Sequence, residues 1–202
     1  MKPKAVVFDL GKVLVHFDWS IAARRMSPRC NLSPEQLLSV FDYSPLVVDY
    51  EMGRVTDEQF YAEVVKLTGF QGNFGEFADL FGNIFSEMPE MIALQAELRQ
   101  RAIPTFIFSN TNALAIEAVR ANYPFFANFD GYVLSYEHGA MKPHAPLYEV
   151  VERMTGQSGA DLLYIDDRQE NVEAGRSRGW QVILQEQPAR TIAAVRATGL
   201  LN

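Results

Sequence analysis

The run Ala5-Val6-Val7-Phe8, followed directly by Asp9-Leu10-Gly11, sets the predicted architecture of this chain. Its four apolar residues are continuous rather than alternating, which is typical of a strand buried on both faces of a parallel sheet. Asp9 comes where that strand ends, and a buried carboxylate is unfavourable unless a partner compensates it. Asp9 is therefore a candidate for chemistry. Gly11, two residues further on, contributes a backbone carbonyl but no side chain.

Four more short apolar runs resemble the first one and indicate further buried strands: Thr105–Phe108, Tyr132–Leu134, Leu162–Ile165 and Gln181–Leu184. Helical patterns lie between or after them, at Ala113–Ala121, Pro146–Met154 and Gln169–Arg178. Strands that alternate with helices predict parallel pairing with right-handed crossovers. We therefore expect an α/β fold with a doubly wound, parallel, five-stranded (Rossmann-like) sheet.

The segment between the first two predicted strands is far longer than one crossover needs. Capping signals at Ser33-Pro34-Glu35-Gln36 and Thr56-Asp57-Glu58-Gln59 indicate helix starts within it. A loop at Gly69–Gly75 precedes a helix at Phe77–Phe85, and a further helix at Glu90–Arg101 leads into the second strand. The segment is thus predicted to be a helical cap inserted after the first strand. The predicted division is a core of residues 1–16 and 88–202 with a cap of residues 17–87.

Composition and charge narrow the class of protein. The chain has 202 residues, of which 48% are hydrophobic and 21% charged, as in ordinary globular domains. The net charge is −7 and no Lys/Arg-rich run occurs, which argues against nucleic acid and against anionic membrane surfaces as partners. No stretch approaches 18 apolar residues, and the N-terminus lacks the pattern of a signal peptide. We expect no membrane span and a cytoplasmic protein.

Polar residues follow the predicted strands where each one ends: Asp9, Ser109-Asn110-Thr111-Asn112, Ser135 with Lys142-Pro143 downstream, and Asp166-Asp167. In an open parallel sheet, ligands bind beyond these carboxyl ends. Separated carboxylates, a hydroxyl beside free amides at a helix start, and a lysine are the groups needed to handle a phosphoryl group with a divalent metal. The sequence therefore predicts a phosphoryl site at this edge.

Four segments resemble the motifs of the haloacid dehalogenase (HAD) superfamily: Phe8-Asp9-Leu10-Gly11, Phe108-Ser109-Asn110, Met141-Lys142-Pro143, and Tyr164-Ile165-Asp166-Asp167-Arg168-Gln169-Glu170-Asn171. They occur in the family's order across nearly the whole chain. Within the superfamily, the chain resembles small cap-bearing phosphatases. The Asn-Tyr-Pro at 122–124 and the Gly139-Ala140-Met141-Lys142-Pro143 run resemble bacterial HAD-like phosphatases that act on sugar phosphates such as glucose 1-phosphate.

The resemblance implies a Mg²⁺-dependent phosphatase that hydrolyses a small phosphorylated metabolite, a sugar phosphate, through an aspartyl-phosphate intermediate. Asp9 is the implied nucleophile. Mg²⁺ is implied to be held by Asp9, the Gly11 carbonyl and Asp167, with Asp166 or Asn171 in support. The groups implied to stabilise the transferring phosphoryl charge are Ser109, the Asn110 amide and Lys142.

Gly11 departs from the usual motif, which has a second Asp there as general acid and base, a role worth about 10²–10⁴ in rate. His16 and Asp18 lie five and seven residues beyond it and are candidate replacements. A leaving group that departs easily also reduces the need for an acid. The anomeric oxygen of a sugar 1-phosphate is such a leaving group, so the chain is expected to prefer anomeric over ordinary alkyl phosphates.

Three alternatives to a phosphatase remain open. A 2-haloacid dehalogenase would use Asp9 to displace halide without metal, but it typically has Tyr at the Gly11 position and needs an Arg, for which Arg24 and Arg25 are available. A catalytically weak member would bind a metabolite or protein partner, and Gly11 alone favours it. The third alternative is a mutase that transfers phosphoryl groups between sugars.

Overall fold

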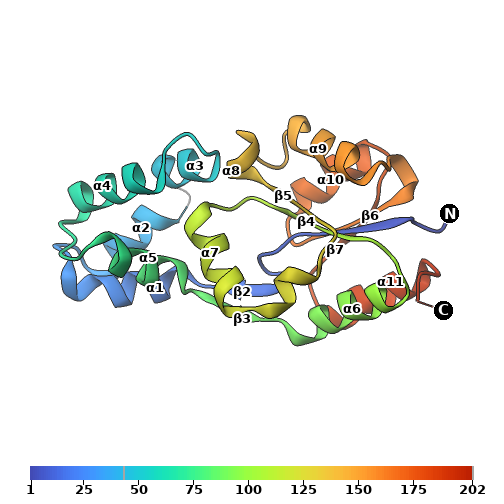
Figure 1. The fold of residues 1–202 in the computed structure, drawn as a ribbon, viewed down its shortest axis with the longest axis horizontal. Coiled ribbons are helices and arrows are strands. Elements are labelled where there is room, and N and C mark those ends of the chain that lie inside the picture. Colours follow the sequence, from blue (N-terminus) through green and yellow to red (C-terminus); the bar gives the residue numbers. More distant parts are fainter. Residues whose placement is uncertain (43, 202) are drawn as a thin grey trace.

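A five-stranded parallel sheet lies at the centre of the half of the molecule that holds both chain termini (Figure 1). The computed structural model describes residues 1–42 and 44–201. The strand order is β5-β4-β1-β6-β7, which confirms the predicted doubly wound α/β sheet. Its members are β1 (Ala5–Phe8), β4 (Thr105–Ser109), β5 (Gly131–Leu134), β6 (Leu162–Asp166) and β7 (Gln181–Leu184).

Both faces of the sheet are covered by helices, so its strands are mostly apolar, with polar residues at their ends. Successive residues of β1 point to opposite faces. Val6 and Phe8 therefore join one hydrophobic cluster, while Ala5 and Val7 join another. Helices α6 (Pro89–Gln100) and α11 (Pro188–Ala197) cover one face in Figure 1, and α9 (Ala145–Thr155) and α10 (Gln169–Ser177) cover the other.

Five helices between β1 and β4 form the other half of the molecule (Figure 1): α1 (Trp19–Met26), α2 (Pro34–Phe41), α3 (Pro45–Glu51), α4 (Asp57–Thr68) and α5 (Phe74–Gly82). The predicted capping boxes are present at Ser33 and Thr56, and Asn73 forms a third one that starts α5. These helices pack around their own hydrophobic cluster, in which six of the fourteen buried residues are aromatic. The predicted helical cap after the first strand is thus confirmed.

Two helix assignments differ from the sequence prediction. The helix expected at Phe77–Phe85 is α5, which Asn73 caps and which begins at Phe74, three residues earlier than predicted. Phe85 belongs to a strand instead. The second difference is α11, which no pattern in the sequence indicated. Its buried residues are Thr191 and Val195 only, so its apolar periodicity is weak.

A short antiparallel ribbon connects the two halves of the molecule. It pairs β2 (Val15–Phe17) with β3 (Phe85–Glu87), so both crossings between core and cap run side by side. We propose the predicted boundaries, residues 17–87 for the cap, as a working division, because β2 ends at Phe17, β3 ends at Glu87 and the cap helices have a separate hydrophobic cluster. Within the described part of the chain, no helix combines the length and apolarity needed to span a membrane.

Candidate active site

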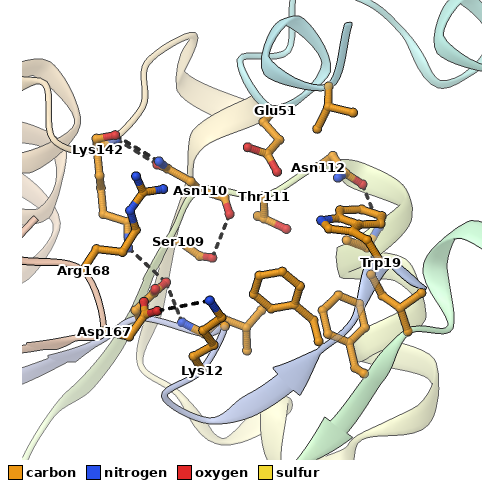
Figure 2. Close-up of a pocket in the computed structure, with 18 of the residues that line it drawn as sticks. Lys12, Trp19, Glu51, Ser109, Asn110, Thr111, Asn112, Lys142, Asp167 and Arg168 are labelled. Atoms are coloured by element: carbon orange, nitrogen blue, oxygen red, sulfur yellow. Dashed lines mark hydrogen bonds and ion pairs between the residues drawn. The ribbon is translucent and has the colours of Figure 1, made fainter. Parts of the chain in front are cut away.

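A cavity of about 320 Å³ opens where the carboxyl ends of β1, β4 and β6 face the cap (Figure 2). Core residues form its polar side: Asp9, Gly11, Lys12, Ser109, Asn110, Thr111, Asn112, Lys142, Asp167, Arg168 and Asn171. The opposite side is mostly apolar and includes Phe17, Trp19, Phe41, Val47, Ile84 and Phe85, with the carboxyl group of Glu51 among them. The cavity therefore joins a charged strand-end region to an aromatic cap wall.

Asp9 is fixed at the end of β1. Its backbone N–H still donates to the carbonyl of Ile165 on β6 (2.9 Å), so the strand geometry continues through it. The side chain is buried, and its Oδ1 accepts the Leu10 N–H (2.7 Å) and lies 3.0 Å from Lys142 Nζ. Burial raises the pKa of Asp9 to about 7 against the opposing effect of Lys142. Both contacts use Oδ1, which leaves Oδ2 for other bonds.

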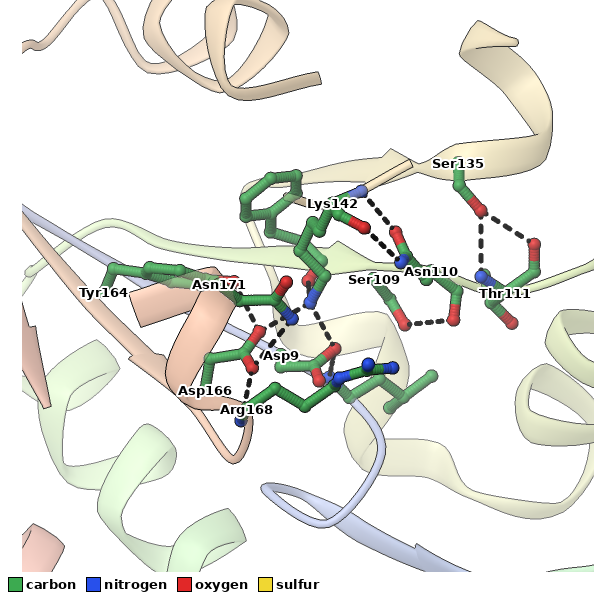
Figure 3. A network of polar contacts seen from close by, with 12 residues as sticks. Asp9, Ser109, Asn110, Thr111, Ser135, Lys142, Tyr164, Asp166, Arg168 and Asn171 are labelled. Carbon is green, nitrogen blue, oxygen red and sulfur yellow. Dashed lines mark hydrogen bonds and ion pairs between the residues drawn. The ribbon is translucent and has the colours of Figure 1, made fainter. Parts of the chain in front are cut away.

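Lys142 carries the positive charge at the centre of the site (Figure 3). Its Nζ donates to the carbonyl of Phe108 (2.9 Å) and contacts Asp166 Oδ2 (2.7 Å) as well as Asp9 Oδ1 (3.0 Å). Burial lowers the pKa of Lys142, but the carboxylates of Asp166 and Asp9 outweigh it, so the net pKa is raised and the ammonium stays charged.

Asp166 is fully buried and completely hydrogen-bonded. Its Oδ1 accepts from the Arg168 N–H (2.8 Å) and from Asn171 Nδ2 (3.0 Å), while Oδ2 accepts from the Tyr164 hydroxyl and from Lys142. Burial alone would raise the pKa of Asp166, but Lys142 reverses this and the pKa is lowered. The ionised form of Asp166 is therefore favoured, and it contacts Lys142 directly.

The loop after β4 supplies hydroxyl and amide groups. The Asn110 side chain pairs with the backbone of Lys142 in both directions: its Nδ2 donates to the carbonyl (3.0 Å) and its Oδ1 accepts the N–H (2.8 Å). Ser109 is buried, with its hydroxyl 3.3 Å from the Asn110 carbonyl. Asn112 caps α7 (Ala113–Asn122), so this loop leads into a helix N-terminus, where anions are favoured.

The carboxylates fit a hard divalent cation. Oxygen atoms of Asp9, Asp166 and Asp167 all lie within 4.8 Å of one another. Because Asp166 uses both of its oxygens inside the network, Asp9 and Asp167 are the donors that remain, and Gly11 lines the same cavity. Asp167 lies 3.9 Å from Lys12 Nζ, and burial raises its pKa. Carboxylate and carbonyl oxygens are the ligands that Mg²⁺ prefers.

The space that a side chain at position 11 would enter is already filled. A Cβ built on Gly11 would lie 2.9 Å from Cε1 and 3.1 Å from Cδ1 of the Phe17 ring. Phe17 belongs to β2, which the sequence analysis did not predict as a strand. Position 11 thus lacks the side chain of a second Asp, and the Phe17 ring occupies the space that such a side chain would enter.

The structure does not bring His16 or Asp18 to the cavity. His16 is exposed on β2 opposite Ser86, and Asp18 is exposed and caps α1 by accepting the Ser20 N–H (2.8 Å). Neither residue lines the cavity, so their placement does not favour either one as the acid and base. The structure does bring together the remaining candidates: Asp9, Gly11, Ser109, Asn110, Lys142, Asp166, Asp167 and Asn171.

Glu51 is a cavity residue that sequence reasoning missed. It is the last residue of α3, in the cap, and burial raises the pKa of its carboxyl group to about 7 although Arg168 and Lys142 act in the opposite direction. No motif marks this position. The Gly53 two residues later, ahead of the Thr56 capping box, was the only nearby signal of a special backbone.

Comparison with known proteins gives consistent results. A family model of haloacid dehalogenase-like hydrolases matches residues 3–179. A sesquiterpene phosphatase (astK) of Aspergillus oryzae is 26% identical over 87% of this chain and 86% of its own length. A D-ribitol-5-phosphate phosphatase of Bacteroides thetaiotaomicron is 22% identical over 92% and 93%. Among solved structures, a HAD family enzyme of Bacteroides thetaiotaomicron in complex with magnesium and inorganic phosphate has a TM-score of 0.79 at 20% identity, covering 90% of this chain and 93% of that one.

Proposed function

Because this chain belongs to the haloacid dehalogenase-like hydrolase family, as its sequence predicts, and is therefore a hydrolase, we propose that it is a Mg²⁺-dependent phosphatase of a small phosphorylated metabolite. The observation that carries the proposal is the buried contact of Asp9 with Lys142 at the end of β1, beside Asp167 and the amides that lead into α7. The two phosphatases to which the chain is similar support the same reaction class.

In the proposed reaction, Asp9 attacks phosphorus and the substrate oxygen departs, which gives an aspartyl phosphate that water then hydrolyses. Lys142 offsets the charge of the transferring group and holds Asp9 in place. Asp166 keeps Lys142 oriented, and Asn110 fixes the Lys142 backbone. Ser109 and the amides after it are placed to bind phosphate oxygens.

Asp9, Asp167 and the Gly11 carbonyl would hold Mg²⁺, with Asp166 and Asn171 supporting them from the buried side. When bound, the ion neutralises phosphate charge and polarises the phosphoryl group. The acidic cluster supports this reaction over metal-free halide displacement, because Asp9 and Asp167 are carboxylate ligands of the kind that Mg²⁺ prefers and halide displacement uses no metal.

The predicted substrate is a sugar phosphate, and the sequence analysis favours an anomeric one such as glucose 1-phosphate. The cavity is large enough for a small organic group next to the phosphate. One of the two relatives is a phosphatase of D-ribitol 5-phosphate and the other of a sesquiterpene, so a polyol or sugar phosphate and an apolar phosphate both belong in the substrate panel.

Phosphate release from p-nitrophenyl phosphate, glucose 1-phosphate and glucose 6-phosphate, with Mg²⁺ and with EDTA, tests the proposal. We expect Mg²⁺-dependent release that Asp9→Asn lowers by at least about 10³-fold, since the amide is not a nucleophile. The control is Asp42→Asn, an exposed carboxyl outside the cavity. Absence of Mg²⁺-dependent release from every substrate would overturn the proposal, and chloride release from 2-chloropropionate without metal would identify a dehalogenase.

A further inference from the structure

The cavity contains one acidic side chain to which the proposed reaction assigns no role. Among the described residues, the acids that line it are Asp9, Asp167 and Glu51. Asp9 is the proposed nucleophile and Asp167 a proposed metal ligand, which leaves Glu51. Figure 2 shows its carboxyl group directed from the cap helix α3 toward the core loop that carries Thr111.

The backbone of Glu51 is attached to the core. The Ser135 hydroxyl lies 2.6 Å from the Glu51 carbonyl oxygen. The Ser135 hydroxyl oxygen in turn accepts the Thr111 N–H (2.9 Å). Ser135 is the first residue of α8 (Ser135–His138) and is fully buried. One hydroxyl therefore joins the end of α3 to the strand-end loop of the active site.

Two neighbours of Glu51 strengthen this attachment. The Tyr50 hydroxyl accepts the Leu114 N–H at the start of α7 (3.3 Å) and donates to Asp57 (2.6 Å). Gly53 has φ +64°, and a Cβ there would lie 2.1 Å from the Tyr136 carbonyl oxygen, so only glycine permits this approach of cap and core. These contacts fix the backbone of Glu51 beside the cavity that its side chain lines.

The charges around Glu51 suit a proton donor. Its carboxyl faces Arg168 and Lys142 from the core, while Asp49 on its own helix is paired with Arg54 (2.8 Å). On α8, the Tyr136 hydroxyl lies 3.2 Å from Glu137. Burial prevails over the two cations, so the carboxyl group keeps its proton to a higher pH than an exposed glutamate does.

We propose that Glu51 donates the proton to the leaving oxygen of the substrate, the role for which position 11 has no side chain; this rests on the proposed phosphatase function. As the bond from Asp9 Oδ to phosphorus forms and the bond from phosphorus to the ester oxygen breaks, the Glu51 proton passes to that oxygen. The products of this step are a neutral alcohol, the aspartyl phosphate and a Glu51 carboxylate. Water that attacks the aspartyl phosphate then releases a proton that restores the acid.

The test compares leaving groups, because only poor ones need a proton. We expect Glu51→Gln to lower kcat/KM for glucose 6-phosphate and propyl phosphate by about 10²–10⁴-fold, the usual contribution of a general acid. The same variant should leave kcat/KM for p-nitrophenyl phosphate nearly unchanged, because p-nitrophenolate departs without protonation. Each kcat/KM value reports the steps up to the first irreversible chemical step. The ratio of kcat/KM for an alkyl phosphate to kcat/KM for p-nitrophenyl phosphate is insensitive to the amount of folded protein, because that amount cancels.

Two further variants make the result specific. Glu51→Asp keeps an acid on a shorter side chain and should lose less activity on the alkyl phosphates than Glu51→Gln does. Glu63→Gln, on the exposed outer side of cap helix α4, should match the wild type on every substrate. Equal losses on all three substrates would overturn the Glu51 proposal, as would a wild type that cleaves p-nitrophenyl phosphate but no alkyl phosphate. If the wild type releases no phosphate from p-nitrophenyl phosphate with Mg²⁺, the phosphatase function itself fails.

Discussion

The polar network at the strand ends and the interior of the cap are stabilised in opposite ways. At the strand ends, Asp9, Lys142 and Asp166 are buried charges held by a network of ion pairs and hydrogen bonds. In the cap, aromatic rings pack on one another, as in the stacked pair Tyr50 and Phe60, whose ring centroids are 4.1 Å apart. The first arrangement tolerates almost no change of geometry, while the second tolerates changes of shape that preserve volume.

This difference separates chemistry from fit. In the proposed reaction, groups with fixed charge and fixed position would serve the reacting phosphoryl group, and the mostly apolar cap wall would enclose the remainder of the substrate. Glu51 is the exception, a carboxyl group that the cap contributes to the polar side. The comparison therefore predicts that substitutions in the network abolish activity, while substitutions in the cap interior affect mainly stability.

Lys142→Met is expected to have the largest effect. It leaves Asp9 and Asp166 buried without their cation, which typically costs about 3–5 kcal/mol of unfolding free energy. The lost stabilisation of phosphoryl charge should lower kcat by about 10²–10³-fold as well. Urea unfolding and p-nitrophenyl phosphate turnover measure both effects. Lys66→Met, an exposed cap lysine paired with Glu63, is the control and should change neither quantity.

Phe81→Ala tests the cap side of the comparison. Phe81 is fully buried and its ring centroid lies 5.0 Å from that of Trp19 and 5.1 Å from that of Phe60. Removal of the ring should cost about 3–5 kcal/mol of unfolding free energy. Unlike Lys142→Met, it should leave kcat for p-nitrophenyl phosphate close to wild type at a temperature where the variant is folded. A loss of kcat as large as that of Lys142→Met would contradict the separation of chemistry from fit.

The same contrast explains what the sequence could predict. Asp9, Ser109, Lys142 and Asp167 each lie at or after the end of a continuous apolar strand, and parallel strands bring their carboxyl ends to one edge. Local pattern and topology therefore suffice to place these residues together. The individual ion pairs of Lys142 with Asp166 and Asp9 were not predicted, because they depend on side-chain geometry that the sequence pattern does not give.

The cap was predicted only as helices after the first strand. Its helix starts carry local capping signals, but the β2–β3 ribbon depends on pairing Val15 with Glu87 across the whole insert. Glu51 lines the cavity, and Ser135, far along the chain, binds its carbonyl there. Such tertiary contacts leave no periodic trace in the sequence, which is why His16 and Asp18, close to Gly11 in the chain, were the expected acids instead.

Gly11→Asp tests the contact that occupies the vacant side-chain position. The new Cβ meets the Phe17 ring, so we expect a loss of about 1–3 kcal/mol in unfolding free energy from overpacking. In the double variant with Phe17→Ala, the two effects should be less than additive by about 1–2 kcal/mol, since the ring that obstructs the Asp is gone. Gly11→Ala, which adds the Cβ without charge, should show the same coupling with Phe17→Ala. Strict additivity in urea unfolding would mean that Phe17 does not fill this space.

The smallest expected effect, and the one most specific to Glu51, is a pH-dependent gain in stability for Glu51→Gln. In the folded protein the pKa of Glu51 is about 7, above its ordinary value of 4.5 in the unfolded chain, so the folded state binds a proton more tightly. Wild-type stability therefore declines as pH rises from about 4.5 to about 7, while the glutamine variant has no such group to titrate. The difference in unfolding free energy, variant minus wild type, should grow by about 1–2 kcal/mol between pH 5 and pH 8, less than full burial would give because the side chain is partly exposed.

Measured in EDTA, this difference concerns the protein without metal, and Glu63→Gln should show no trend. A constant difference across this range would mean that Glu51 titrates like a surface carboxyl group. A growing difference would mean that the cap holds a carboxyl group over the cavity that keeps its proton to a higher pH than an exposed glutamate does.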